Sequence, residues 1–280
     1  MKQVSFWGVQ HGLGVTTNTA AITTSIAKDY HYRILVSQPQ WSDYTLEQSF
    51  KKSINQYNKN VSSLSGTGLD ALLRLARSYK LDRESVKDNS MMIEKDRMDL
   101  LTGSEKADLR LFEDSMEYIS TIFAKAKEYY QAIFLDLHSG NNSYFIQSAI
   151  EQSDLVVVCL NQNIHVLNKY FSGENLPAAL QKKPKIILLG QYDKQSKYKI
   201  QTIKKLFGTS DPMYPLSYSP QIRDAFNDGD IKGFFSQNRH ISKGHTNYDF
   251  MKDVRAISKA ILTELGFDVT VNELLESGVS

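Results

Sequence analysis

Apolar residues along the chain fall into short continuous runs that alternate with helically spaced patterns. The continuous runs predict strands over residues 3–9, 32–37, 97–103, 132–137, 155–161, 185–193 and 213–218. Amphipathic patterns predict helices over residues 16–30, 67–79, 108–130, 143–152 and 249–265. Runs such as LVVVCL at 155–160 show no polar alternation, which is typical of strands buried on both faces of a sheet.

Helices that alternate with buried strands indicate parallel crossover connections. We therefore expect a doubly wound α/β fold, with a mostly parallel sheet flanked by helices, in one domain over residues 1–280. The polar residues 51–65, rich in Asn, Ser and Lys, predict a mobile surface excursion from that domain.

The composition is that of an ordinary globular protein. The formal net charge is +2, and 41% of the residues are hydrophobic. Cys159 is the single cysteine, so an internal disulfide is excluded. The N-terminus has no secretory signal pattern, and no apolar run approaches the roughly 20 residues of a membrane span. These features predict a cytoplasmic protein.

The stretch SFWGVQHGLGVTT at 5–17 has the form of a strand, a glycine-rich turn and the start of a helix. Such a loop binds phosphate through backbone N–H groups that glycines bring together, a lysine, and a Ser or Thr hydroxyl that holds magnesium. Gly12, Gly14, Thr16 and Thr17 fit this frame, and the helix N-terminus adds partial positive charge. Val15 stands where the lysine is needed.

Two other interpretations of this turn stay open. GLGVTT also begins like the G-x-G-x-x of a dinucleotide-binding turn, although no acid follows the second strand before Asp43 to hold a ribose. The turn is alternatively a purely structural connection.

A second pattern, AIFLDLHSG at 132–140, places Asp136 at the end of an apolar strand and Gly140 four residues later. A carboxylate there suits a magnesium-bound water, and the glycine suits a segment that moves with a terminal phosphate. An Asp at a strand end is also often just a helix cap. Together with the first loop, the pattern predicts Thr16 and Asp136 as the magnesium ligands.

Residues 182–205 combine many lysines with one acid, Asp193. This local excess indicates a surface for DNA or an acidic protein, or else only a solvated helix face and loop. The lysines are Lys182, Lys183, Lys185, Lys194, Lys197, Lys199, Lys204 and Lys205. By contrast, His11, His138 and His165 have no spacing typical of a zinc site.

With these residues in place, the chain resembles the ParA/MinD group of P-loop ATPases, whose signature is K-G-G-x-G-K-T-T. The matching stretch is QHGLGVTT, so the resemblance implies a nucleotide contacted by Gln10, His11, Gly12, Leu13, Gly14, Val15, Thr16 and Thr17. It further implies ATP with Mg²⁺ as the cofactors, a homodimer, Gly140 near the terminal phosphate, and Pro215 in a loop that flanks the adenine. The segment YPLSYSPQIRDAFNDG at 214–229 looks most like the TadZ-type proteins of pilus assembly, which act at cell poles.

The sequence departs from the family pattern at its charged positions. Gln10 and Val15 replace both signature lysines. The family's D-x-D-P-Q after the second strand reads VSQPQ, so Val36 and Gln38 replace two aspartates, the second of which is associated with positioning the attacking water. Loss of two charged phosphate donors is expected to cost about 3 to 6 kcal/mol, a hundredfold to ten-thousandfold in affinity.

We therefore expect a degenerate member of the family that binds ATP and Mg²⁺ weakly or not at all and is not an efficient ATPase. It would serve as a binding or scaffold component, recruited to the pole or membrane by a protein partner. The alternative is a slow, active ParA-type ATPase that binds DNA through the lysines of residues 182–205. The acidic tail after Gly266, which lacks Lys and Arg, argues against a C-terminal lipid-binding helix.

Overall fold

The structure, a computed structural model, describes residues 1–39, 45–57, 66–104, 114–137, 139–140 and 143–270. Its centre is one eight-stranded sheet in the order β3-β4-β2-β5-β1-β6-β7-β8. The strands are β1 (Lys2–Gly8), β2 (Ile34–Ser37), β3 (Met91–Glu94), β4 (Met98–Leu101), β5 (Ala132–Asp136), β6 (Leu155–Leu160), β7 (Lys185–Tyr192) and β8 (Met213–Ser217). All neighbouring strands pair in parallel except β3, which runs antiparallel to β4. The predicted doubly wound, mostly parallel α/β fold is therefore confirmed.

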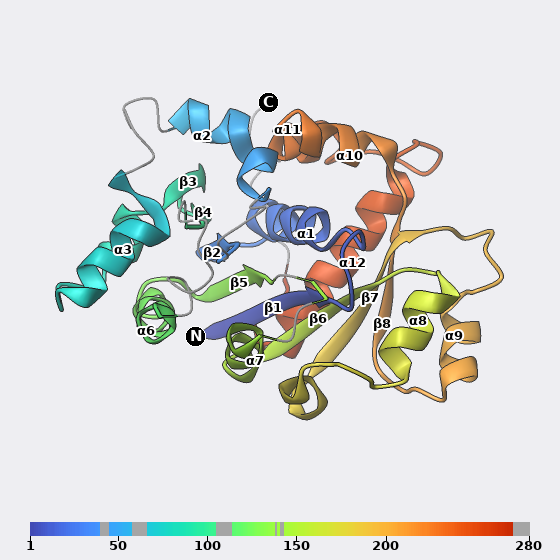
Figure 1. Cartoon of the computed structure of the whole chain (residues 1–280). Coiled ribbons are helices and arrows are strands. Elements are labelled where there is room, and N and C mark those ends of the chain that lie inside the picture. Colours follow the sequence, from blue (N-terminus) through green and yellow to red (C-terminus); the bar gives the residue numbers. More distant parts are fainter. Residues whose placement is uncertain (40–44, 58–65, 105–113, 138, 141–142, 271–280) are drawn as a thin grey trace, which may run out of the picture.

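Helices cover both faces of this sheet (Figure 1). The helices are α1 (Val15–Asp29), α2 (Lys51–Tyr57), α3 (Gly68–Arg77), α4 (Ser85–Asp88), α6 (Met116–Ala126), α7 (Tyr144–Glu151), α8 (Ile164–Phe171), α9 (Ile200–Phe207), α10 (Pro220–Asn227), α11 (Ile231–Gln237) and α12 (Tyr248–Glu264), with short 3-10 helices η1 (Glu47–Phe50) and η3 (Ala178–Lys182). On one face α1 packs against α12 and α11, while α6 and α7 lie on the opposite face (Figure 1). One hydrophobic core extends over both faces, and all six residues of β6 are buried in it.

Several sequence predictions are corrected in detail. Within the predicted excursion, residues 51–57 form helix α2, in which Ser53 is buried. Residues 58–65 lie outside the described part of the chain. The helix predicted over 108–130 is described only as α6, and residues 127–129 form a turn after it. Strand β3 and helices α8 to α11 were not predicted, because their apolar runs are short and interrupted by polar residues.

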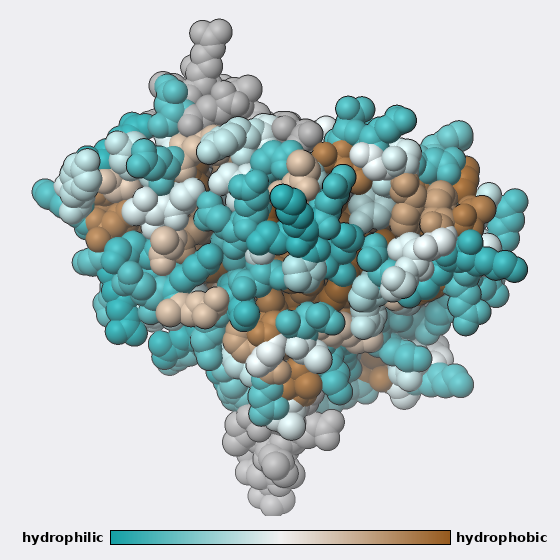
Figure 2. Space-filling view, turned by 90° about the horizontal axis from the view of Figure 1, so that it is seen from below, coloured by the Kyte–Doolittle hydropathy of each residue, from teal (hydrophilic) through white to brown (hydrophobic). Residues whose placement is uncertain are grey.

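Seen from below relative to Figure 1, the surface is mainly hydrophilic, with hydrophobic residues in small areas among polar ones (Figure 2). Within the described residues, no helix combines the length and apolar character needed to cross a membrane.

The strand order places the predicted site. β5 lies between β2 and β1, and all three end at the same edge of the sheet. Phe6 of β1 is in register with Asp136 of β5, and Ser37 of β2 is in register with Leu135. Gln38, the residue after β2, is therefore brought beside Asp136, and the loop after β1 follows on the other side.

Candidate functional site

The loop between β1 and α1 has the backbone of a tight glycine turn. Gly12 and Gly14 have φ angles of +80° and +74°, in the left-handed region that disfavours residues with a Cβ. Gly14 directly precedes α1, and its carbonyl accepts the first helical hydrogen bond, from the N–H of Asn18 at 2.8 Å. The first turn of α1 contains no acidic residue, so its N–H groups and partial positive charge favour an anion.

Val15, at the position of the loop lysine, is part of the hydrophobic core. Its side chain is 6% exposed, and a Cβ placed on Gly8 would lie 3.1 Å from Val15 Cγ2 and 3.3 Å from Leu13 Cδ1. Val15 and Leu13 thus pack over the end of β1, where the absence of a side chain on Gly8 leaves room for them. The loop keeps its glycine geometry but presents no charged donor at this position.

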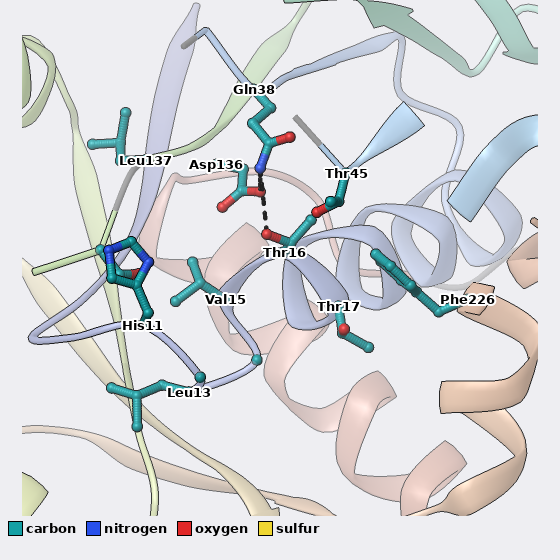
Figure 3. A pocket seen from close by; sticks show the side chains of 13 residues that line it. His11, Leu13, Val15, Thr16, Thr17, Gln38, Thr45, Asp136, Leu137 and Phe226 are labelled. Atoms are coloured by element: carbon teal, nitrogen blue, oxygen red, sulfur yellow. Dashed lines mark hydrogen bonds between the residues drawn. The ribbon is translucent and has the colours of Figure 1, made fainter. Parts of the chain in front are cut away.

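Gln38 links the start of α1 to the end of β5 (Figure 3). Its Nε2 donates a hydrogen bond of 2.7 Å to Asp136 Oδ2 and lies 3.4 Å from Thr16 Oγ1. Its Oε1 accepts a hydrogen bond of 3.1 Å from the N–H of Leu46, directly before η1. Both ends of the amide are satisfied, so Gln38 is held between the Asp136 carboxylate and the segment that follows β2.

Asp136 is almost completely buried, with 2% of its surface exposed. Burial raises the pKa of its carboxyl to about 7, and hydrogen bonds from Thr16 and Gln38 oppose this only in part. A cation beside the carboxylate would instead lower the pKa. Of the described residues that line the adjoining cavity, none is lysine or arginine.

A magnesium ion between Thr16 and Asp136 does not fit this arrangement while Gln38 stays in place. The two oxygens are hard ligands of the right kind. However, the amide nitrogen of Gln38, which can only donate hydrogen bonds, already lies within hydrogen-bond distance of both. Gln38 would have to rotate away before a cation could bind there. Among the described residues, no group of three or more His, Cys, Asp or Glu side chains is arranged to hold a metal.

A cavity of about 330 Å³ opens over the loop. Its walls include most of the predicted site, namely His11, Gly12, Leu13, Gly14, Val15, Thr16, Thr17 and Asp136. It also contains Thr45, Leu137, Ser139 and Phe226, which the sequence analysis did not identify. Phe226 comes from α10, nearly 90 residues after Ser139, and no local pattern marks it (Figure 3).

Gln10 and Gly140 do not line this cavity but meet beside it. The N–H of Gly140 donates to the carbonyl of Gly8 at 2.9 Å, and a Cβ on Gly140 would lie 3.2 Å from the Cα of Gln10. Gly140 has a φ of +69°, so both the conformation and the close approach require glycine. His138, between Asp136 and Gly140, lies outside the described residues.

A second, smaller cavity of about 140 Å³ adjoins the first along α1. It is lined by Gly14 and Thr17, and by residues 216–219 at the end of β8. Pro215, expected in the loop after the last strand, lies inside β8 in register with Leu189 and does not line the cavity. The loop begins later than predicted because β8 continues to Ser217.

Six of the eight lysines of residues 182–205 lie in two groups at the two ends of β7. Lys182, Lys183 and Lys185 lie at the start of β7, while Lys194, Lys197 and Lys199 follow its end at the opposite edge of the sheet. An eight-residue strand separates the two groups by about 25 Å. Lys194 is also ion-paired with Asp249 of α12. These six lysines are therefore divided in space, and the remaining two, Lys204 and Lys205, lie in the last turn of α9.

Superposition on solved structures identifies the fold. A ParA family ATPase from Chlorobium tepidum superposes with a TM-score of 0.68 over 92% of this chain and 98% of its own, at 14% identity. MinD from Pyrococcus horikoshii in complex with Mg-ADP gives 0.67 over 94% and 98%, at 16% identity. A structure described as a plasmid partition protein from Borrelia burgdorferi, bound to AMPPNP, gives 0.66 over 94% and 99%, at 12% identity.

The fold is that of the ParA and MinD ATPases. The chain matches no known family by sequence. It also matches no curated protein. At these low identities the likeness to ParA and MinD establishes the fold alone, over nearly the whole length of both chains. The loop after β1, Gln38 and Asp136 lie at the carboxyl edge of this ParA/MinD fold, where open parallel sheets bind ligands.

Proposed function

We propose that this chain is a degenerate ParA/MinD-like protein that acts as a binding or scaffold component with weak or no ATP hydrolysis. Its setting would be the positioning or assembly of a cellular machine of the pilus, secretion or partition type. The observation that carries the proposal is the hydrogen bond from Gln38 to Asp136, in a cavity whose described lining holds no lysine or arginine.

Phosphoryl transfer depends on positioned cationic groups that stabilise charge on the transferred phosphate. In this chain Val15 is buried beside Gly8 and Gln10 lies outside the cavity. The Gln38 amide approaches the oxygens of Thr16 and Asp136 that would otherwise hold a metal. Backbone N–H groups of the loop remain, which supports at most weak binding of a phosphate-containing ligand.

The proposal includes a homodimer that forms through the face around the cavity, and a protein partner that recruits the chain to a pole or membrane. A protein that keeps the fold but lacks the lysines needed for phosphoryl transfer suits such a role, because a surface that binds another protein does not require those lysines. Light scattering of the purified chain, with and without ATP and Mg²⁺, tests this part. We expect the same dimer in both conditions, and a monomer in both would contradict it.

Binding is tested by thermal melting of the chain with and without millimolar ATP and Mg²⁺. A ligand that binds the folded state raises the midpoint in proportion to its affinity. We expect a small shift or none. A shift of many degrees, abolished in Asp136→Ala, would contradict the proposal.

A slow ParA-type ATPase that binds DNA is the second candidate, favoured by the cavity of about 330 Å³ that persists over the glycine loop. The divided lysines support only separate, small DNA contacts. Replacing Lys194, Lys197 and Lys199 with Gln in one variant, and Lys182, Lys183 and Lys185 in a matched one, tests which group binds duplex DNA. Strong, salt-dependent binding lost in either variant would favour this candidate.

A further inference from the structure

Tyr79 follows helix α3 in a backbone conformation that disfavours a residue with a side chain. α3 ends at Arg77, and Tyr79 has a φ of +55°. Its N–H donates to the carbonyl of Ala76 at 3.0 Å, and the N–H of Lys80 donates to the carbonyl of Leu75 at 2.9 Å. These two hydrogen bonds define a Schellman motif, whose left-handed position is usually occupied by glycine.

Two other helices of this chain end in the same way with glycine. After α10, Gly229 and Asp230 donate to the carbonyls of Phe226 and Ala225, and after α12, Gly266 and Phe267 donate to those of Thr263 and Leu262. Gly229 and Gly266 have φ angles of +69° and +76°. A Cβ disfavours this conformation, whereas glycine adopts it readily. Tyr79 therefore imposes a cost that the chain avoids at the two equivalent positions.

The Tyr79 side chain offsets none of this cost within the described part of the chain. It is 94% exposed, and no hydrogen bond, ion pair or ring contact with another described residue engages it. Both faces of its ring are open to solvent. The helix end requires the left-handed conformation at this position but not a tyrosine, and a residue kept in a strained conformation is typical of functional positions.

Exposed cations surround Tyr79 in the sequence. Arg74 and Arg77 lie in the last turn of α3 and Lys80 follows the tyrosine, with no acidic residue from 74 to 81. The Arg77 guanidinium is held in place, because it donates to Ser115 Oγ at 2.8 Å and lies 5.7 Å from the centre of the Tyr118 ring. Cations at a helix C-terminus are explained by the helix dipole. The tyrosine is not.

We propose that the end of α3, with Tyr79 at its centre, binds single-stranded nucleic acid. An open aromatic ring on which a base stacks, flanked by cations that contact phosphates, is the combination that single strands require. A stable protein interface has a core depleted of charge, whereas the exposed neighbours of Tyr79 are charged or polar. A bilayer surface would need several apolar side chains to insert, and Tyr79 is the only large exposed apolar residue of this helix end.

The proposal is independent of whether the cavity over the glycine loop binds a nucleotide. It is tested by fluorescence anisotropy of a labelled 20-nucleotide oligo(dT) with the full chain at low salt. We expect salt-dependent binding that weakens by about fivefold or more in Tyr79→Gly and is retained in Tyr79→Phe, because loss of stacking costs at least about 1 kcal/mol per base. Tyr144→Ala is the matched control, since Tyr144 is 75% exposed at the start of α7 without adjacent cations in the sequence.

Thermal melting of each variant shows whether a loss of binding results from a loss of folding. Tyr79→Gly relieves backbone strain, so its midpoint should not fall below that of the unchanged chain. Absence of binding to oligo(dT), or equal affinity of the unchanged chain and Tyr79→Gly, would overturn the proposal. It would also be overturned if duplex DNA or phosphatidylserine vesicles bound in a Tyr79-dependent manner while oligo(dT) did not.

Discussion

The amide nitrogen of Gln38 lies 2.7 Å from a carboxylate oxygen of Asp136 and 3.4 Å from the hydroxyl oxygen of Thr16. Removal of the amide in Gln38→Ala leaves the buried carboxylate with Thr16 alone and leaves the N–H of Leu46 without its acceptor. Hydrogen bonds to charged or buried groups are worth about 1.5 to 3 kcal/mol. We expect the free energy of unfolding in urea to fall by about 2 kcal/mol or more.

Gln152→Ala is the matched control, because the Gln152 amide makes hydrogen bonds on the exposed surface of α7. Its loss should change the free energy of unfolding by less than about 0.5 kcal/mol. Equal effects of the two substitutions would show that Gln38 does not stabilise the site.

Restoring charge at the site should restore ligand binding. In Val15→Lys combined with Gln38→Asp, the first change returns the phosphate donor and the second removes the amide from Asp136. Each charged donor contributes about 1.5 to 3 kcal/mol, so ATP affinity should rise roughly tenfold to a hundredfold. The measurement is the shift of the thermal midpoint on addition of ATP and Mg²⁺. Val15→Met with Gln38→Asp, which lengthens the side chain without charge, should show no such gain, and an equal gain in both would refute this explanation.

The buried Asp136 predicts a pH dependence of stability. Because burial raises the pKa of its carboxyl to about 7, the folded chain holds this proton more tightly than the unfolded chain. Its contribution to stability is therefore present near pH 4, is lost as the pH rises to 7, and stays constant above that. Asp136→Asn, which keeps an acceptor for Gln38, should gain stability over the unchanged chain by a few kcal/mol at pH 8 and much less at pH 4.

Asp99→Asn provides a comparison for that profile. Burial raises the pKa of the Asp99 carboxyl to about 6, although a hydrogen bond from Tyr130 opposes the shift. The difference between Asp99→Asn and the unchanged chain should therefore level off about one pH unit lower than that of Asp136→Asn. A pH-independent difference for Asp136→Asn would contradict the raised pKa.

Much of the fold could be predicted from local patterns, whereas part of the site could not. The buried runs of β1, β5 and β6 are continuous, so their strands and parallel pairing follow from the sequence. Thr16 and Asp136 were also predicted, because Asp136 ends an apolar strand and Thr16 lies two residues after the last glycine of the turn. The position of Gln38 beside Asp136 depends on the pairing of β2 with β5, which are distant in sequence, and the packing of Val15 over Gly8 depends on how the loop folds back on β1. Phe226 lies on α10, and no local sequence pattern predicts that this helix packs beside the cavity.

The junction between α10 and α11 predicts a large penalty for a small change. A Cβ on Gly229 would lie 2.6 Å from the Cβ of Lys51 and 2.7 Å from the carbonyl oxygen of Gln48, and its φ is +69°. Gly229→Ala should therefore reduce the free energy of unfolding by about 3 kcal/mol or more, because the neighbouring backbone would have to move and the alanine would also be strained at this φ angle. Gly266→Ala has the same helix-end geometry with nothing within 4 Å of the added Cβ, and should cost only about 1 kcal/mol.

The most direct test of the account is a continuous phosphate-release assay on the unchanged chain, with saturating ATP and Mg²⁺, beside Asp136→Ala. No lysine or arginine is among the described residues that line the cavity, so we predict equal release by both proteins, at the background of the assay. Magnesium-dependent turnover by the unchanged chain that disappears in Asp136→Ala would show that the site is a working ATPase and would contradict the account.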